Sequence, residues 1–196
     1  MYLEYYGLKN RPFQINTDST MLWLGEKHRE ALAALKYGVF ENKGFLLLTG
    51  DIGTGKTTLI NALIRSLGKE IICATISNPG MEKLDFLNYI ARVFRIKKRF
   101  DSKGEFLIYF SHFLHKAREN NKRVLLIVDE AQKLTQELLD EIRLLSNTEI
   151  PNSKLINIFF IGQNEFNDIL NKSENEALKQ RITLNYNQKA LTKKET

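Results

Sequence analysis

Short runs of apolar residues alternate along this chain with longer stretches in which apolar residues recur every three or four positions. The runs have the length of strands, and the longer stretches have the length and period of helices. The runs are FLLLT (45–49), IICATI (71–76), VLLIV (124–128), KLINIFFIG (154–162) and RITLNY (181–186). Strands that alternate with helices predict a parallel sheet with helices packed on its faces.

The stretches between these runs predict the helices. They cover residues 26–41, about 56–67, 81–95, 103–119 and 136–147, with shorter helical pieces over 164–180. Residues 1–25 are rich in aromatic side chains and are expected to be irregular. The predicted fold is α/β, a P-loop three-layer α/β/α sandwich with a five-stranded parallel sheet. We expect residues 1–41 to pack on a core formed by residues 42–190.

The segment after the first predicted strand carries the most specific chemical signal. Residues 50–57, GDIGTGKT, match G-x-x-x-x-G-K-[ST] between a strand and a helix, the context in which this loop binds phosphates. Its glycines let the backbone approach phosphate oxygens, and the next helix directs N–H groups at the anion. Lys56 is expected at the β- and γ-phosphates, and Thr57 at Mg²⁺. The predicted nucleotide contacts are Gly50, Asp51, Ile52, Gly53, Thr54, Gly55, Lys56, Thr57 and Thr58.

Two carboxylates follow the third apolar run directly. Asp129 and Glu130 come after LLIV, and an acidic residue at such a strand end holds Mg²⁺ in P-loop enzymes. We expect Asp129 to bind the metal with Thr57, and Glu130 to polarise a water for attack on the γ-phosphate. The alternative is an ordinary solvated pair at a strand end. The carboxyl ends of parallel strands share one edge, so these residues should lie beside the P-loop.

The base is expected to be adenine. NKSE at 171–174 resembles a guanine-reading motif, but it follows a helical stretch and has Glu174 in place of the aspartate. We interpret it as a helix end or turn, and we expect ATP and ADP as ligands.

Composition limits the remaining possibilities. The net charge is +6 with a pI near 9.3, which permits nucleic acid, acidic lipid or acidic protein as partner. The single cysteine, Cys73, excludes an internal disulfide. No apolar run approaches the ~20 residues that cross a bilayer, so we expect a cytoplasmic protein with no membrane contact within this chain.

A basic segment joins the helices predicted over 81–95 and 103–119. ARVFRIKKRF (91–100) interleaves five cations with Phe94 and Phe100. Cations and aromatic rings together can bind a nucleic-acid strand by charge and stacking. The same residues also fit a solvated helix end whose phenylalanines face the core. Both interpretations stay open, with nucleic acid the less favoured partner.

With these motifs in place, the chain resembles the AAA+ ATPases of the general secretion pathway protein A (ExeA) family. The resembling segments are YYGLKNRPF (5–13), LWLGEKHREALAALKYGV (22–39), DEAQKLTQELLDEIRLLSN (129–147), IGQNEF (161–166) and LKQRI (178–182). Asn164 stands where the family has a proline. ATPases of the TniB and MuB type, which serve transposition, share much of this core.

The resemblance implies further roles. Gln163 would sense the γ-phosphate and the attacking water from the end of the fourth strand. Arg181 would be an arginine finger offered to the ATP of a neighbouring subunit, from a position expected at the nucleotide edge of the sheet, so self-association is implied. Thr192–Glu195 has the T-x-x-E form that starts a helix, and residues 191–196 would begin a truncated lid domain.

The expected function is therefore ATP binding and Mg²⁺-dependent hydrolysis. Hydrolysis would be coupled to assembly or remodelling of a protein partner, in a secretion or envelope system whose full-length protein could be membrane-anchored beyond residue 196. Two alternatives remain: a DNA-associated ATPase of the transposition-accessory or loader type, and a nucleotide-gated scaffold with negligible turnover.

Overall fold

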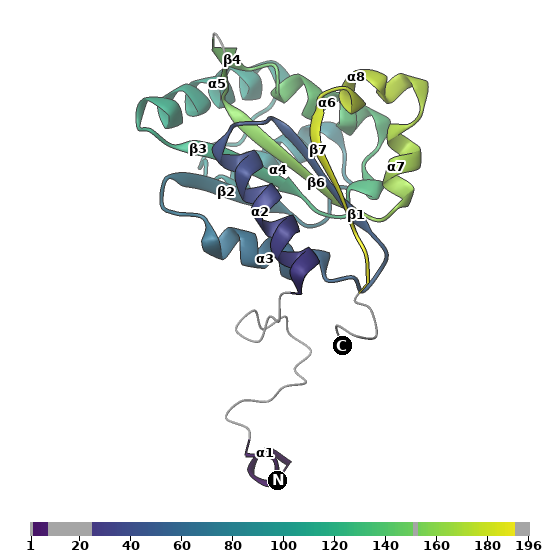
Figure 1. Cartoon of the computed structure of the whole chain (residues 1–196). Coiled ribbons are helices and arrows are strands. Elements are labelled where there is room, and N and C mark those ends of the chain that lie inside the picture. The colour runs from purple at the N-terminus through teal and green to yellow at the C-terminus, as the bar shows by residue number, and fades with distance from the viewer. Residues whose placement is uncertain (1, 8–24, 151–152, 191–196) are drawn as a thin grey trace.

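The computed structural model describes residues 2–7, 25–150 and 153–190. Its centre is a five-stranded sheet in the order β2-β3-β6-β1-β7, in which all neighbours are parallel (Figure 1). The strands are β1 (Phe45–Gly50), β2 (Ile71–Ile76), β3 (Arg123–Val128), β6 (Ile156–Gly162) and β7 (Ile182–Gln188). They coincide with the five apolar runs, and the predicted α/β fold is confirmed.

Helices cover both faces of this sheet. Helices α2 (Glu26–Phe40) and α3 (Lys56–Ser66) pack on one face against Leu46, Leu125 and Phe159. The other face, with Leu47 and Leu126, packs against α4 (Lys83–Val93), α5 (Lys103–Glu119), α6 (Gln136–Leu145), α7 (Glu165–Leu170) and α8 (Glu176–Lys179). Figure 1 shows α2 on the near side of the sheet. Strand residues alternate between the two faces, which explains why β1, β3 and β6 are apolar almost throughout.

Some elements differ from the prediction. Residues Tyr2–Tyr5 form a short helix, α1, within the segment expected to be irregular. Strands β4 (Glu149–Ile150) and β5 (Ser153–Lys154) form an antiparallel pair that was not predicted, because two residues are too few to show a period. Helix α4 ends at Val93, and Arg95 then adopts a left-handed φ of 61°.

The domain division is only partly covered by the structure. Helix α2 packs against α3 and β7, and the division of the chain at residue 41 stays a prediction. Most of the segment before α2, and the predicted lid start at 191–196, lie outside the described residues. Within the described part of the chain, none of the helices has both the length and the apolar character needed to cross a bilayer.

Candidate nucleotide-binding site

The loop between β1 and α3 has the backbone of a phosphate cradle. Gly53 and Gly55 have left-handed φ angles of 79° and 85°, which favour glycine. A Cβ on Gly50 would lie 2.3 Å from the backbone oxygen of Gln188, so this position also requires glycine. Helix α3 begins at Lys56, and no side chain in the described part of the protein caps its first N–H groups, which can therefore face an anion.

Lys56 links the end of this loop to its beginning. Its Nζ donates to the backbone oxygens of Gly50 and Asp51, each at 2.8 Å. The Thr54 hydroxyl donates to the same Asp51 oxygen at 2.9 Å. The Lys56 ammonium therefore lies at the opening of the phosphate cradle. Its two carbonyl acceptors can be replaced there by phosphate oxygens.

The predicted residues of the loop and of two strand ends surround one cavity. It has a volume of about 410 Å³ and is lined by Ile52, Gly53, Gly55, Lys56, Thr57, Thr58, Asp129, Glu130 and Gln163. Gly50, Asp51 and Thr54 do not line it; their contacts instead shape the loop. The structure thus gathers the predicted cation, hydroxyl, carboxylates and amide around a single space.

Asp129 and Glu130 lie at the end of β3. The Asp129 N–H donates to the Ile76 oxygen at 2.8 Å, and the Asp129 carboxylate accepts from the Glu130 N–H at 2.9 Å. Burial raises the pKa of the Asp129 carboxyl, and the Glu130 N–H bond opposes this only in part. Glu130 has a left-handed φ of 55°, which is costly for a residue with a side chain. Such strain at a cavity is typical of a functional turn.

Gln132 joins the two strand ends and was missed by the sequence analysis. Its Nε2 donates to Glu130 Oε2 at 3.0 Å, and its Oε1 accepts from the Gln163 N–H at 3.1 Å. Lys133 also lies 3.4 Å from Glu130 Oε2. The glutamate carboxylate is therefore held in place beside Gln163. The sequence carries no signal for this contact, because chain order does not show that β6 lies beside β3.

A second polar network, also missed, connects the turn after β6 with the P-loop. Asn164 Nδ2 donates to Asp51 Oδ1 at 2.6 Å, and Asn164 Oδ1 accepts from Asn187 Nδ2 at 2.9 Å. Asn187 and Asn167 each donate to the buried Thr49 hydroxyl, at 3.3 and 3.4 Å. The amide of Asn164 thus anchors the loop to β6 and β7.

A buried polar pair lies behind the loop. His28 of α2 and Gln188 of β7 are 7% and 1% exposed, and their Nε2 atoms are 3.1 Å apart. The Gln188 amide nitrogen also donates to the Lys189 oxygen at 3.2 Å. A Cβ on Gly55 would lie 3.6 Å from the imidazole. The pair therefore supports the loop from the α2 side.

Arg181 does not lie where the sequence analysis placed it. Ile182 pairs with Phe45 at the start of β1, whereas Gln188 pairs with Gly50 at its end. Six strand residues span about 20 Å, so Arg181 lies at the edge of the sheet opposite the P-loop. The expectation of a position at the nucleotide edge is wrong, because the residue before a parallel strand lies at the amino edge. Arg181 cannot reach the phosphate site of its own chain from there.

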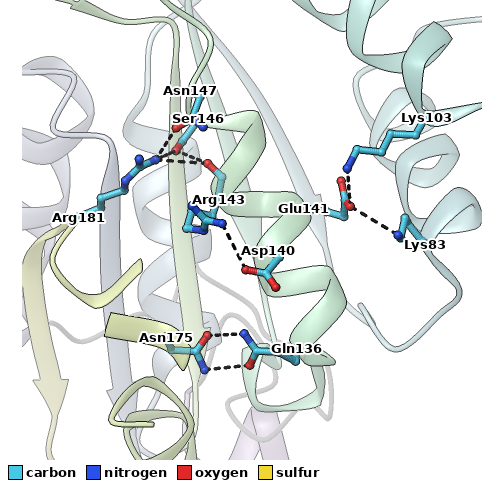
Figure 2. Close-up of polar contacts among 10 residues, drawn as sticks. All are labelled: Lys83, Lys103, Gln136, Asp140, Glu141, Arg143, Ser146, Asn147, Asn175 and Arg181. Atoms are coloured by element: carbon cyan, nitrogen blue, oxygen red, sulfur yellow. Dashed lines mark hydrogen bonds and ion pairs between the residues drawn. The ribbon is translucent and has the colours of Figure 1, made fainter. Parts of the chain in front are cut away.

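Arg181 instead binds the carboxyl end of α6. Its Nη1 donates to the Ser146 hydroxyl at 3.1 Å and to Asn147 Oδ1 at 2.5 Å, and it lies 3.5 Å from the Arg143 oxygen (Figure 2). A cation is favoured at a helix C-terminus by the helix dipole. Whether Arg181 acts on a neighbouring subunit stays a prediction.

Helix α6, which follows the carboxylate pair, is fixed along its length. Gln136 and Asn175 exchange two amide hydrogen bonds of 2.7 and 3.0 Å (Figure 2). The buried Glu141 binds Lys103 at 2.7 Å and Lys83 at 3.7 Å. Two cations offset the cost of burying this carboxylate. Together with Arg181, these contacts join α4, α5, α6 and the segment before β7.

The NKSE segment is a turn, as predicted. Asn171 caps the end of α7, and residues Ser173–Asn175 form a 3-10 helix. It follows no strand and lines none of the P-loop cavity, so nothing supports a guanine-reading role.

Comparisons with known proteins identify the family of this chain. The AAA domain family matches residues 40–170, which are 131 of the 196 residues. Over 188 residues, 95% of its length, the chain is 38% identical to General secretion pathway protein A of Aeromonas hydrophila. It covers 34% of that protein, so it spans about a third of the relative's length.

Solved structures share the fold at low identity. The ORC2 protein of Aeropyrum pernix, in ADPNP–ADP complexes, has a TM-score of 0.68 and 17% identity, over 89% of this chain and 50% of that one. Drosophila ORC bound to DNA has a TM-score of 0.60 and 13% identity, over 95% and 51% of the two chains. The family match covers most of the chain and includes the P-loop, Asp129, Glu130 and Gln163. This chain therefore belongs to the AAA domain family, with an AAA+ core resembling general secretion pathway protein A.

Proposed function

We propose that this chain binds ATP with Mg²⁺ and hydrolyses it to ADP and phosphate. The observation that carries the proposal is the single cavity lined by Lys56, Thr57, Asp129, Glu130 and Gln163. The family and the loop support nucleotide binding in general; the reaction and the metal are our inference from these side chains.

The P-loop supplies the ground-state binding. Its N–H groups and the start of α3 cradle the phosphates, and Lys56 exchanges the carbonyl oxygens of Gly50 and Asp51 for phosphate oxygens. The Asn164–Asp51 bond keeps the loop in place during this exchange.

The residues fit a magnesium ion. A hydroxyl and a carboxylate are the hard oxygen ligands that Mg²⁺ takes beside nucleotide phosphates, and Thr57 and Asp129 line the same cavity. Burial raises the pKa of Asp129, and a cation nearby would offset that cost. When bound, the ion would neutralise the charge that develops on the phosphate oxygens.

Glu130 performs the proton chemistry. Its carboxylate, held by Gln132, accepts a proton from a water whose oxygen forms a bond to the γ-phosphorus. The bond between that phosphorus and the β–γ bridging oxygen breaks, and the electron pair leaves with ADP. Gln132 bonds both the Glu130 carboxylate and the Gln163 backbone, which places Gln163 near Glu130. From there Gln163 orients the water and the γ-phosphate.

Nucleotide-dependent stabilisation tests this proposal. At a hundredfold excess over Kd, ATP with Mg²⁺ should stabilise the fold by about 2.7 kcal/mol, or roughly 5–10 °C in Tm for a chain of this size. GTP should give less, and Lys56→Ala should abolish the shift. A larger shift with GTP, or none with any nucleotide, would refute ATP binding.

For the partner on which the ATPase acts, we propose only a class of protein. The similarity to General secretion pathway protein A supports a role in assembling or remodelling a protein partner of a secretion or envelope system. The protein would act as an oligomer at the cytoplasmic side, where ATP is available. The second candidate is a DNA-associated ATPase, which the net charge of +6 permits. DNA affinity that falls with salt at a log–log slope near −0.9 per phosphate contact would support it.

A further inference from the structure

The segment that joins α4 to α5 lies between two hollows in the surface. The first, of about 530 Å³, is lined by residues that include Met81, Tyr89 and Arg92. The second, also about 530 Å³, lies against α5. Ile96 and Lys97 line both, so the two hollows adjoin. We call the segment 94–102 the connector and this surface the connector groove. None of the residues that line the groove lines the P-loop cavity.

The connector is anchored by its phenylalanines. Phe94 and Phe100 are 6% and 1% exposed, so they belong to the core. Asn88 exchanges hydrogen bonds of 2.8 and 2.9 Å with the backbone of Phe100. This confirms the packing interpretation of the two rings and leaves them unable to stack on a base. The residues between them are held at the surface by these two anchors.

Five cations of the groove are unpaired. The side chains of Arg92, Arg95, Lys97, Arg99 and Lys116 are exposed and form no hydrogen bond or ion pair with the described part of the chain. Lys98 alone among the groove cations is paired, with Glu105 at 2.8 Å. Asp85 is the only acidic residue in the described lining. The groove therefore presents a net positive charge that Asp85 and the Lys98–Glu105 pair offset only in part.

The floor of the groove is apolar, and neighbouring side chains already contact two of its rings. Met81, Tyr89, Ile96 and Phe113 are partly buried against the core. Phe113 stacks on Phe110 at 5.7 Å. Tyr109 lies under the Lys98 ammonium at 5.6 Å and against the Phe100 ring at 5.4 Å. Single-stranded nucleic acid gains its affinity from open ring faces as well as charge, and Phe110 and Lys98 already cover one face each of Phe113 and Tyr109.

We propose that the connector groove binds an acidic, partly apolar segment of a partner protein. Carboxylates of that segment would contact the unpaired cations at the rim, and its apolar side chains would fill the two hollows. A buried apolar anchor with a charged rim is the usual composition of a peptide site. The phosphates of a nucleic acid would pair with the cations, but they would leave the two apolar hollows unfilled.

Fluorescence anisotropy with three labelled probes tests this proposal. The first is a synthetic peptide in which Glu and Asp alternate with Leu and Phe. The second keeps the acids but replaces Leu and Phe with Ser, and the third is a polythymidine strand of equal net charge. We expect the first probe to bind about tenfold more tightly than either of the others, a difference of 1.4 kcal/mol.

Two triple variants locate the binding. Arg92→Gln with Lys97→Gln and Arg99→Gln should weaken the first peptide about tenfold, or 1.4 kcal/mol. Arg65→Gln with Lys69→Gln and Lys172→Gln removes equal charge from exposed cations elsewhere and should change affinity less than about twofold. All six side chains are exposed, and circular dichroism checks that both variants fold.

Four results would overturn the proposal. They are equal binding of the Ser peptide, tighter binding of the polythymidine strand, an equal loss in both triple variants, or no binding of the first peptide. Tighter binding of polythymidine that depends on Arg92, Lys97 and Arg99 would assign the groove to nucleic acid.

Discussion

Asn164 donates a 2.6 Å hydrogen bond to the carboxylate of Asp51, and this bond joins the turn after β6 to the P-loop. Asn164 also accepts a bond from Asn187 of β7. Three strand ends, those of β1, β6 and β7, are thereby connected by side chains at the mouth of the phosphate site. A proline at position 164 could not form either contact, because it has no side-chain amide.

We predict that Asn164→Ala lowers ATP affinity about fivefold, because a hydrogen bond to a partly exposed carboxylate contributes about 1 kcal/mol. Asn164→Asp should lower it further, since it places a second carboxylate against Asp51, and the additional loss should shrink in high salt. Isothermal titration with ATP and Mg²⁺ measures both. Asn171→Ala, which removes an exposed asparagine bonded to Lys179, is the matched control. Unchanged affinity in both Asn164 variants would mean that the bond does not position the loop.

Asp129→Asn should separate stability from function. Burial raises the pKa of Asp129, so ionising this carboxyl destabilises the folded state relative to the unfolded one. Because the folded-state pKa of Asp129 is raised, this carboxyl stabilises the fold most fully at a pH below its unfolded-state pKa. That stabilisation is lost as the pH rises through the folded-state pKa. In nucleotide-free protein with EDTA, Asp129→Asn should therefore raise Tm at neutral pH and have less effect in acid.

The same variant should lose the Mg²⁺-dependent part of ATP binding. Thermal unfolding at acidic and neutral pH, with and without ATP and Mg²⁺, measures both effects. Asp168→Asn removes an exposed carboxylate of α7 and serves as control. If Asp129→Asn lowers Tm at neutral pH, burial of the charge is not the dominant cost at this position.

Arg181→Ala is predicted to bind ATP normally and to lose most turnover. Arg181 lies about 20 Å from its own P-loop, too far to contact the ATP of its own chain. As an arginine finger it would therefore act on the γ-phosphate bound by a neighbouring subunit. Arginine fingers contribute roughly 10³–10⁵ in rate. Mixing Arg181→Ala with Lys56→Ala should restore part of the phosphate release, because one chain supplies an intact site and the other an intact arginine.

A structural role for Arg181 needs its own control. Ser146→Ala with Asn147→Ala removes the acceptors on α6 but keeps the arginine. If this double variant loses as much turnover as Arg181→Ala, the arginine acts by anchoring α6. If mixed oligomers form and recover no activity, action across subunits is refuted.

Much of the site was predictable because of one property of parallel sheets. Residues that follow apolar strands meet at one edge, so the P-loop, Asp129, Glu130 and Gln163 could be placed together from their positions in the sequence alone. Arg181 precedes β7 instead of following it, so the same property places it at the opposite edge from the P-loop.

The polar networks were not predictable from the sequence. Gln132 contacts Gln163, and Asn164 contacts Asp51, only because β6 lies between β3 and β1. The order of strands along the chain does not reveal which strands are adjacent in the sheet, since β6 lies between β3 and β1, which both precede it in the sequence. The unpaired cations of the connector were visible in the sequence, but the burial of Phe94 and Phe100 was decided by packing.

Single-turnover conversion of ATP tests the central proposal most directly. With Mg²⁺ and protein in excess over ATP, we predict that the wild-type chain forms ADP and phosphate, whereas Lys56→Ala does not. Glu130→Gln should bind ATP as tightly as the wild type and convert it about a hundredfold more slowly or worse, because general-base catalysis contributes roughly 10²–10⁴. Bound ATP that stays intact in the wild-type protein would contradict hydrolysis and favour a nucleotide-gated scaffold. Conversion by Glu130→Gln at the wild-type rate would contradict the role of Glu130.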